Sequence, residues 1–179
     1  MNIFKRFFGH LHTVNKHRRE VRKLCFKCGL YWQGLTHDLS KYSPVEFFNG
    51  VKYYTGTASP HVTERADKGH SDAWLHHKGR NRHHAEYWID IRGNGKHEPV
   101  HMPTRYLIEM VCDRIAASKI YLKDKYHDGT PLEYYESHWG ENNYHIATRY
   151  SLEDILAYLS KHGEKETIKF LRELLEMNK

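Results

Sequence analysis

At 179 residues, the chain is long enough to bury a core but short for two, so the sequence predicts a single domain over residues 1–179. Its formal net charge of +6 and pI near 9.1 favour anionic partners such as nucleotides, nucleic acid or phosphorylated metabolites, without choosing among them. Three cysteines provide no disulfide framework, and no apolar run approaches the roughly 20 residues of a membrane span. We therefore expect a cytoplasmic protein that does not enter a membrane.

The first predicted helix covers residues 7–30. Its apolar side chains recur on one face at helical spacing, at Val14, Val21, Leu24 and Cys28. His17 falls on the same face and is expected to point inward, while His10, two turns earlier on that face, is its rival as a site residue. The pair Cys25 and Cys28 has no second cysteine pair to complete a metal site, so packing is its expected role.

The segment His37-Asp38-Leu39-Ser40-Lys41 places a histidine and a carboxylate side by side, with a lysine close behind. Imidazole and carboxylate groups both bind divalent metals, and a lysine can hold a substrate anion beside them. A lone histidine-aspartate pair often occurs by chance. Here further histidines precede and follow the pair, and a carboxylate follows later, so a metal centre is the better interpretation.

A second helix is expected just beyond this segment. Ser43-Pro44-Val45-Glu46 has the pattern of an N-cap, a proline at the first helical position and a capping-box glutamate, and Gly56 marks the end. The next residues, 57–71, are polar and have no apolar period, which predicts a loop that could fold over a site. We expect its histidines, His61 and His70, to be exposed.

Residues 74–88 are rich in histidine and in aromatic side chains. His77 and His84 are two helical turns apart, so they share a face if the helix is continuous. His76 and His83 share the neighbouring face in the same way. Such a concentration of imidazoles between aromatic residues is not typical of a plain solvated surface.

A break in this helix is equally consistent with the sequence, because Gly79 interrupts it. In that case Asn81 is expected to be the N-cap of a second helix, with the second histidine pair in its first turn. Several imidazoles converge in either arrangement. Arg80 and Arg82 beside them would suit a phosphate group.

Residues 93–103 form a turn-rich connector, and Thr104 is then expected to cap a long helix that reaches about Tyr126. The inward face of this helix carries one carboxylate among apolar side chains: Tyr106, Met110, Asp113, Ala117 and Ile120. Burying an unpaired charge is costly, so Asp113 should meet a metal or a cation. Glu109, one turn earlier, is the alternative.

The remainder is expected to be structural. An aromatic segment packs back on the core through Tyr134, Tyr135 and Trp139. Ser151 with Asp154 opens a helix that Gly163 ends, and a last amphipathic helix carries Ile168, Leu171, Leu174 and Leu175. These helices, over residues 151–177, should pack against a metal-site core of about residues 10–125. Every predicted element is helical, so the expected fold class is all-α.

The order of these residues resembles the HD domain superfamily, with an early helical histidine, a histidine-aspartate pair, further histidines and a final aspartate on a long helix. The segment from His37 to Lys41 looks like that superfamily's His-Asp-x-x-Lys variant, and the resemblance covers roughly residues 17–120. A narrower resemblance is to a small uncharacterised family of unknown function in bacteria and phages, through that segment together with Asn81-x-His83-His84, Tyr87-Trp88 and Glu109-Met110-x-x-x-Asp113. The superfamily resemblance implies an HD-domain-like helical bundle around a metal centre.

Carried over to this sequence, the superfamily resemblance implies that a first metal is held by His17, His37, Asp38 and Asp113. The positions of the extra histidines in two-metal members match His77, His83 and His84. One or two divalent ions are therefore implied, from among Mn, Fe, Zn, Co and Mg. The sequence departs from the pattern in the short distance between its first two histidine ligands and in its doubled histidines, which leave the individual assignments open.

The resemblance implies hydrolysis of phosphomonoesters or phosphodiesters most often, and oxygen chemistry at two irons less often. We therefore expect a metal-dependent phosphohydrolase acting on a nucleotide or another small phosphate ester. Asp38 and Lys41 would be catalytic, and Lys41, Arg80 and Arg82 would bind the phosphate. The alternatives are a di-iron oxygenase and a non-catalytic, basic nucleic-acid-binding module with a structural metal. No basic stripe along one helix and no nucleic-acid motif supports the last of these.

Overall fold

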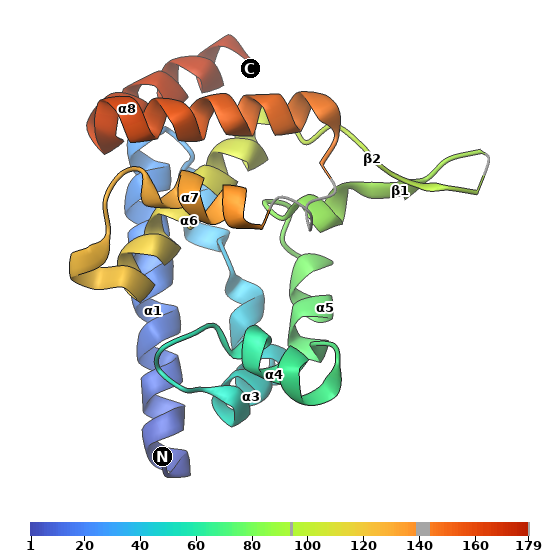
Figure 1. The fold of residues 1–179 in the computed structure, drawn as a ribbon, viewed down its shortest axis with the longest axis vertical. Coiled ribbons are helices and arrows are strands. Elements are labelled where there is room, and N and C mark those ends of the chain that lie inside the picture. Colours follow the sequence, from blue (N-terminus) through green and yellow to red (C-terminus); the bar gives the residue numbers. More distant parts are fainter. Residues whose placement is uncertain (94, 139–143, 179) are drawn as a thin grey trace.

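The computed structural model describes residues 1–93, 95–138 and 144–178, and they are helical apart from one small two-stranded sheet (Figure 1). The predicted all-α class is confirmed at this level. Trp139, predicted to pack back on the core, lies outside the described residues. In chain order the elements are α1 (Ile3–Lys27), α2 (Tyr31–Thr36), η1 (Leu39–Tyr42), α3 (Pro44–Tyr53), α4 (Pro60–Lys68), α5 (Asp72–Lys78), η2 (Ala85–Trp88), β1 (Ile89–Ile91), β2 (His97–Pro99), α6 (Thr104–Leu122), η3 (Lys123–Lys125), α7 (Thr130–Ser137) and α8 (Ile146–Met177).

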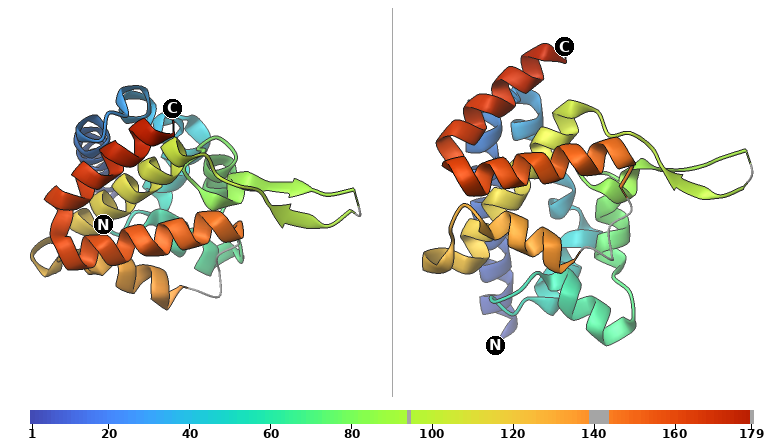
Figure 2. Two further views of the ribbon diagram at one scale, coloured as in Figure 1. Left: turned by 90° about the horizontal axis from the view of Figure 1, so that it is seen from above. Right: turned by 45° about the horizontal axis from the view of Figure 1, so that its top comes forward.

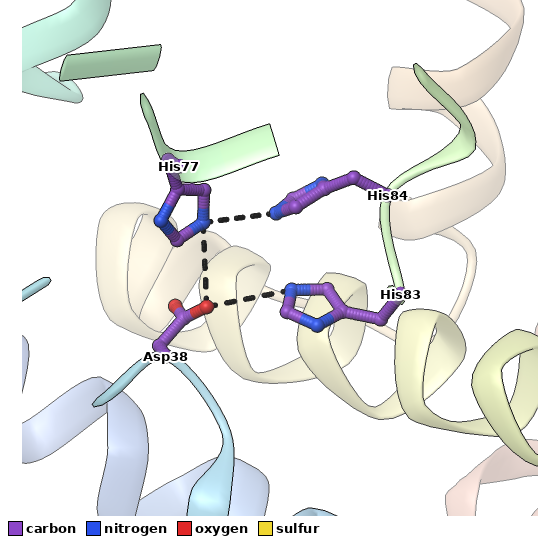
Figure 3. A group of neighbouring side chains, drawn as sticks. All are labelled: Asp38, His77, His83 and His84. Carbon is purple, nitrogen blue, oxygen red and sulfur yellow. Dashed lines mark hydrogen bonds and ion pairs between the residues drawn. The ribbon is translucent and has the colours of Figure 1, made fainter. Parts of the chain in front are cut away.

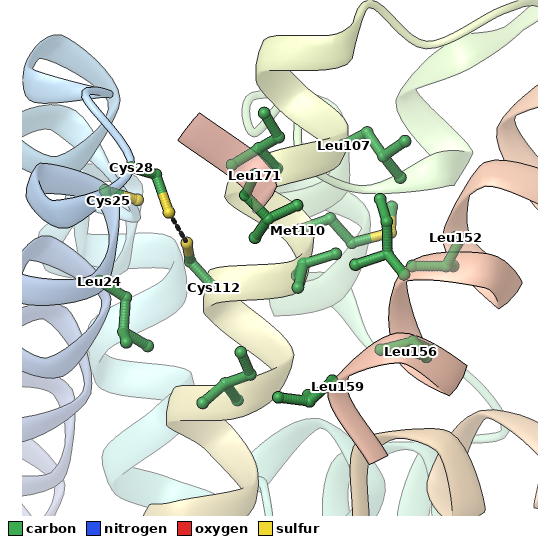
Figure 4. Packing of buried hydrophobic residues seen from close by; sticks show 14 of the residues in the cluster. Leu24, Cys25, Cys28, Leu107, Met110, Cys112, Leu152, Leu156, Leu159 and Leu171 are labelled. Atoms are coloured by element: carbon green, nitrogen blue, oxygen red, sulfur yellow. Dashed lines mark hydrogen bonds between the residues drawn. The ribbon is translucent and has the colours of Figure 1, made fainter. Parts of the chain in front are cut away.

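Helices α1 and α6 form the centre of the fold. The side chain of Asn2 caps α1 by accepting a hydrogen bond from Lys5 N at 2.9 Å, and Gly29, with φ of 86°, turns the chain after the helix. Helix α6 packs against α1, and α8 covers α6 from the other side. The hydrophobic core lies where these three helices meet (Figure 4), and its labelled members are Leu24, Cys25, Cys28, Leu107, Met110, Cys112, Leu152, Leu156, Leu159 and Leu171.

The three cysteines are free thiols inside this core. Cys28 Sγ lies 4.0 Å from Cys112 Sγ, and Cys25 and Cys28 are both fully buried. The C-x-x-C pair therefore packs in the core, as the sequence predicts.

Helices α3, α4 and α5 gather at the end of the molecule where α1 begins (Figure 1). Helix α3 starts as predicted, with Ser43 Oγ accepting from Glu46 N at 3.4 Å and Pro44 at the first helical position. It ends at Tyr53, close to the predicted end. Both α4 and α5 pack on α3.

Helix α4 corrects the prediction of a loop over residues 57–71. Its buried residue is a carboxylate, Glu64, so hydrophobic periodicity gives no signal for it. Glu64 accepts hydrogen bonds from Ser71 Oγ at 2.6 Å and Asn49 Nδ2 at 2.6 Å, and also from the backbone at the start of α5. Polar contacts therefore fix a helix that apolar packing would normally fix.

The predicted turn-rich connector over residues 93–103 contains strand β2, which pairs with the preceding strand β1 in a β-hairpin. Strands β1 and β2 pair antiparallel, with Asp90 opposite Glu98, and the hairpin extends away from the helices (Figures 1 and 2). Each strand has three residues, and Ile91 is exposed. Strands so short, with little burial, leave no clear alternating pattern in the sequence.

Several observed helix ends differ from the predicted ones. Helix α6 begins with Pro103 as N-cap, so Thr104 is its first helical residue, and it ends at Leu122 rather than near Tyr126. Helix α8 begins at Ile146, five residues before the predicted start. The predicted helix end at Gly163 is confirmed, because this residue has non-helical backbone angles, with φ of 78°, and divides α8 into two helical arms at a kink. The two arms of α8 on either side of the kink cross the top of the molecule in Figure 1.

Among the described residues, no helix combines the length and the apolar character that crossing a bilayer requires.

Candidate metal centre

Five separate parts of the chain bring the predicted metal ligands together. Helix α1 supplies His17, and the turn between α2 and η1 supplies His37 and Asp38. Helix α5 supplies His77, and Asp113 comes from α6. The remaining two, His83 and His84, precede η2. All seven predicted residues lie in two groups whose ligand atoms are within 4.8 Å of one another, and their role as ligands stays a prediction.

The first group contains His17, His37, Asp38 and Asp113. His17 Nε2 lies 2.9 Å from Asp113 Oδ1 and 3.5 Å from Asp38 Oδ2. His37 Nε2 lies 3.4 Å from Asp38 Oδ2 and 3.6 Å from Asp113 Oδ1. Two imidazole nitrogens and two carboxylate oxygens therefore face one another at the junction of α1 and α6.

The second group contains Asp38, His77, His83 and His84 (Figure 3). His77 Nε2 lies 3.3 Å from Asp38 Oδ1 and 3.0 Å from His84 Nε2. His83 Nε2 lies 3.4 Å from the same oxygen of Asp38. This group therefore offers three nitrogens and one oxygen.

Asp38 belongs to both groups and turns a different oxygen to each. Its Oδ2 faces His17 and His37, and its Oδ1 faces His77 and His83. The residue has φ of 54°, a left-handed conformation that aspartate tolerates better than most residues, and its side chain is buried. The backbone turn therefore places one carboxylate between two clusters of imidazoles.

The residues fit divalent metal ions. Ligand atoms about 2.1 Å from a tetrahedral ion lie roughly 3.4 Å apart, and the contacts of Asp38 with the four imidazoles are 3.3 to 3.5 Å. Asp38 Oδ1 and His83 Nε2 are buried and have no hydrogen-bond partner among the described residues. Such atoms are costly to bury without a partner, and a metal ion between them would supply one.

Two buried glutamates hold the far side of the imidazole rings. Glu109 Oε1 lies 2.8 Å from His37 Nδ1 and 3.2 Å from His83 Nδ1, so one carboxylate serves both groups. Glu46 Oε2 lies 2.7 Å from His77 Nδ1. A carboxylate at Nδ1 keeps the proton there and leaves Nε2 free to bind a metal.

These two glutamates show what the sequence interpretation missed. Glu109 was expected only as the alternative to Asp113, and Glu46 only as a capping-box residue. Glu46 does occupy the predicted place in the first turn of α3, but its side chain turns to His76 Nδ1 at 2.6 Å and to His77. A buried glutamate three residues after a cap has the same sequence pattern as an exposed one, so no sequence signal separates them.

Lys41 closes the cluster on the side of Asp38. Its Nζ lies 2.7 Å from Asp38 Oδ2. Burial tends to raise the pKa of Asp38, but the positive charges of His37 and Lys41 hold that pKa well below its usual range. Burial likewise tends to lower the pKa of Lys41, and Asp38 raises it above its usual range. Both shifts favour the ion pair between Asp38 and Lys41.

The imidazoles differ in charge according to their neighbours. Burial disfavours the charged form of His37, but Asp38 and the carboxylates of α6 raise its pKa well above the usual value. Burial lowers the pKa of His84 well below that value, and the charges of His83 and His77 add to the effect. The surroundings thus shift the pKa values of these two imidazoles in opposite directions.

The other sequence candidates lie outside the two groups. His10 is buried against Phe47 and Tyr54, so His17 and not His10 belongs to the cluster. Arg80 donates to the carbonyl of His76, and Arg82 lies over two tyrosine rings. Both arginines are exposed, and their contact with a substrate stays a prediction.

The histidine-rich segment breaks where the second alternative placed the break. Helix α5 ends at Lys78, and Asn81 follows outside any helix. Asn81 does not cap a second α-helix, because turn residues and then a 3₁₀ helix follow it. Its Nδ2 instead donates to the carbonyl of His77 at 2.8 Å and to Ser40 Oγ at 2.8 Å. The chain then continues into the 3₁₀ helix η2.

The prediction that His61 is exposed is wrong. It is half-buried, and its ring centroid lies 5.4 Å from that of Trp74 and 6.0 Å from that of His77. His70 is exposed as predicted. Helix α4 therefore covers one side of the cluster.

A family model covers most of this structure, including all seven predicted metal ligands. It matches residues 6–158, and its description is a family of unknown function, DUF5662. The chain belongs to the DUF5662 family. No curated protein and no solved structure matches it. In this DUF5662 protein, buried groups of histidine, aspartate and glutamate could hold metal ions, and the family description adds no activity to that finding.

Proposed function

We propose that this protein is a metal-dependent phosphohydrolase that acts on a nucleotide or another small phosphate ester. The observation that carries the proposal is Asp38, a buried carboxylate shared by two groups of four metal-ligating side chains, with the cationic Lys41 against it. A cation beside two adjacent metal positions suits a substrate with a doubly charged phosphate. The resemblance of the segment from His37 to Lys41 to the HD domain superfamily supports the same class of reaction.

The donor atoms narrow the choice of metal. Five imidazole nitrogens and two carboxylates make up the two groups. Magnesium prefers oxygen ligands, whereas imidazole suits zinc, iron and similar transition metals. We therefore favour Mn, Fe, Zn or Co over Mg, with His17, His37 and Asp113 on one ion, His77, His83 and His84 on the other, and Asp38 between them.

Divalent ions bound there would polarise a phosphoryl oxygen and lower the pKa of a water molecule. The chain's own residues would do the rest. Lys41 keeps its proton because Asp38 raises its pKa, so it would neutralise phosphate charge rather than act as a base. Glu109 would keep the Nδ1 protons of His37 and His83 in place.

The test is metal analysis followed by an activity screen. Protein purified without added metal should contain one or two equivalents of a transition metal. Supplemented with Mn²⁺, Co²⁺, Zn²⁺ or Fe²⁺, it should release phosphate from a phosphomonoester or phosphodiester panel, and Lys41→Ala should reduce this release. Inactivity towards the whole panel in every metal would overturn the proposal.

Two other outcomes would replace the proposal with the alternative functions. Bound iron whose optical spectrum responds to oxygen, without phosphate release, would indicate a di-iron oxygenase. Strongly salt-dependent binding to DNA or RNA, without turnover, would indicate a nucleic-acid-binding module with a structural metal.

A further inference from the structure

A second polar site lies on the surface of α1, behind the metal centre. It is a hollow of about 210 Å³. Among the described residues, its lining contains three arginines and no acidic side chain: Asn15, Arg18, Arg19, Arg22, Gly34 and Tyr42. This arginine hollow has no part in the function proposed above.

Arg18 is held in a fixed orientation in the arginine hollow. Its Nε donates to the carbonyl of His37 at 2.8 Å, one Nη donates to the carbonyl of Leu35 at 3.0 Å, and the other donates to Tyr42 Oη at 3.2 Å. A guanidinium has five N–H groups, so two remain for a ligand. The charge is therefore pre-oriented, and a ligand would not have to displace these contacts.

Arg19 and Arg22 complete the positive lining. Both are exposed, and neither has a hydrogen bond or an ion pair with any residue in the described ranges. Three guanidinium groups around one hollow repel one another, and an anion between them would relieve this repulsion. Arginine is well suited to this, since its planar fork matches a phosphate in a bidentate contact.

Residues of the arginine hollow are neighbours in sequence of residues in the metal centre. Arg18 follows His17 directly, and Tyr42 follows Lys41. The carbonyl that Arg18 binds belongs to His37, whose imidazole is in the first metal group. One backbone segment therefore separates the two sites.

We propose that the arginine hollow binds a phosphate group, either as inorganic phosphate or as part of a small phosphate ester. The contacts available are the two remaining N–H groups of Arg18 and the unpaired guanidinium groups of Arg19 and Arg22. The proposal does not depend on the metal or on catalysis, because no residue of the hollow belongs to the metal groups.

Calorimetric titration of the whole protein with inorganic phosphate tests this site. The wild-type protein should bind one phosphate at the hollow as purified, in addition to any that the metal centre holds. It should still bind about one after EDTA treatment, provided that circular dichroism shows the helices to be intact. The double variant Arg19→Ala/Arg22→Ala should bind phosphate at least about 10-fold more weakly, since each charge-assisted contact is substantial. Lys161→Ala/Lys169→Ala removes the same charge from exposed positions on α8 and should leave the affinity unchanged.

Three results would overturn the proposal. One is equal phosphate affinity in the arginine double variant and the wild type as purified. Another is loss of binding on EDTA treatment of a folded protein, which would put the phosphate on the metal. The third is an equal loss in the lysine double variant, which would show an effect of net charge alone. A glucose 6-phosphate titration separates the two phosphate sources, because it competes with phosphate only if the hollow also accepts an ester.

Discussion

Along α1, the buried side chains include histidines near the start of the helix and are apolar near its end. The residues facing inward near its end, Val21 and Leu24, join the apolar core with α6 and α8. The residues facing inward earlier are His10, Val14 and His17, and two of these three are titratable. Helix α6 also carries both kinds of residue, with Ile108 in the core and the next residue, Glu109, in the histidine cluster. One region is thus stabilised by apolar burial, and the other gathers ionisable groups.

This difference separates stability from binding. Apolar burial stabilises the folded chain without any ligand, at about 25 cal/mol per Å² of surface removed from water. Buried ionisable groups cost free energy unless a partner compensates them, so they are not an efficient way to stabilise a fold. We therefore expect substitutions in the two regions to affect different measurements.

The largest expected effect is that of Asp38→Asn. Asparagine tolerates the left-handed backbone of this position but cannot bridge two cations as a carboxylate does. Metal content should fall and metal-dependent turnover should drop at least about 100-fold, since even the loss of a group behind a ligand costs 10- to 100-fold. Helical circular dichroism should stay largely intact. Elemental analysis and kinetics measure these quantities.

Asp67→Asn is the matched control, because Asp67 accepts a hydrogen bond from Tyr53 Oη away from the cluster. Full metal content and turnover in Asp38→Asn would mean that the shared carboxylate is not the centre of the site.

In the apolar region, Leu156→Ala should give the opposite result. Leu156 is fully buried in the core, and removing a buried leucine side chain typically lowers the free energy of unfolding by about 2 to 5 kcal/mol. Metal stoichiometry should not change under conditions where the variant is folded. Urea denaturation and elemental analysis test this, and loss of metal from the folded variant would break the division between the two regions.

A smaller effect is expected from Glu109→Gln, which changes the hydrogen bonds of one imidazole in each group. The affinity for the metal ion should fall about 10- to 100-fold at both metal positions. Glu46→Gln is the comparison, because within the two groups Glu46 contacts His77 alone. Glu46→Gln should weaken metal binding only at the position that includes His77. The arrangement would be contradicted if metal titration showed that both variants weaken the binding of the same one ion.

The smallest effect concerns His10 and pH. Burial, aided by the charge of Lys41, lowers the pKa of His10 to about 4, below its ordinary value of 6.5. Between these two pH values, His10 is therefore protonated in the unfolded chain but not in the folded chain. The free energy of unfolding falls as pH falls through this range. From pH 6.5 to 4.5 the loss should be about 2 kcal/mol.

His10→Leu should remove this part of the pH dependence. Urea denaturation at both pH values, for the wild type and the variant, isolates the contribution of His10, because acid effects on the metal centre are common to both. Identical slopes against pH would show that His10 titrates normally in the folded protein. His70→Leu, at an exposed position, is the control.

The parts of this structure that could be predicted from sequence have a strong helical period. Helices α1 and α3 each have an apolar and a polar face, and on α1 this period predicts that His17 points inward. The period is weaker on α6, where residues 107–112 are all buried and Asp113 is half-buried. The histidine-aspartate pair could be placed because it ends one helix just before another begins. These features depend on local sequence, which is why they were accessible.

The rest depends on contacts between distant residues. Helix α4 was missed because Glu64 anchors it, and Glu109 was not assigned to both groups because its two partners come from different segments. The sharing of Asp38 between two groups follows from the direction of each carboxylate oxygen, which a sequence does not encode locally. The arginine hollow likewise forms only where α1 meets the turns around α2.

The anchoring of α4 by Glu64 gives this helix its own response to temperature. When α4 separates from α3 and α5, the buried side chain that it exposes is a hydrogen-bonding group, Glu64, and the apolar surface uncovered is mainly that of Tyr53 and Trp74. The heat-capacity change of this local opening should therefore be small, unlike that of global unfolding. Amide exchange in α4 should be faster than in the core, and each opening uncovers His61 and the adjoining side of the histidine cluster.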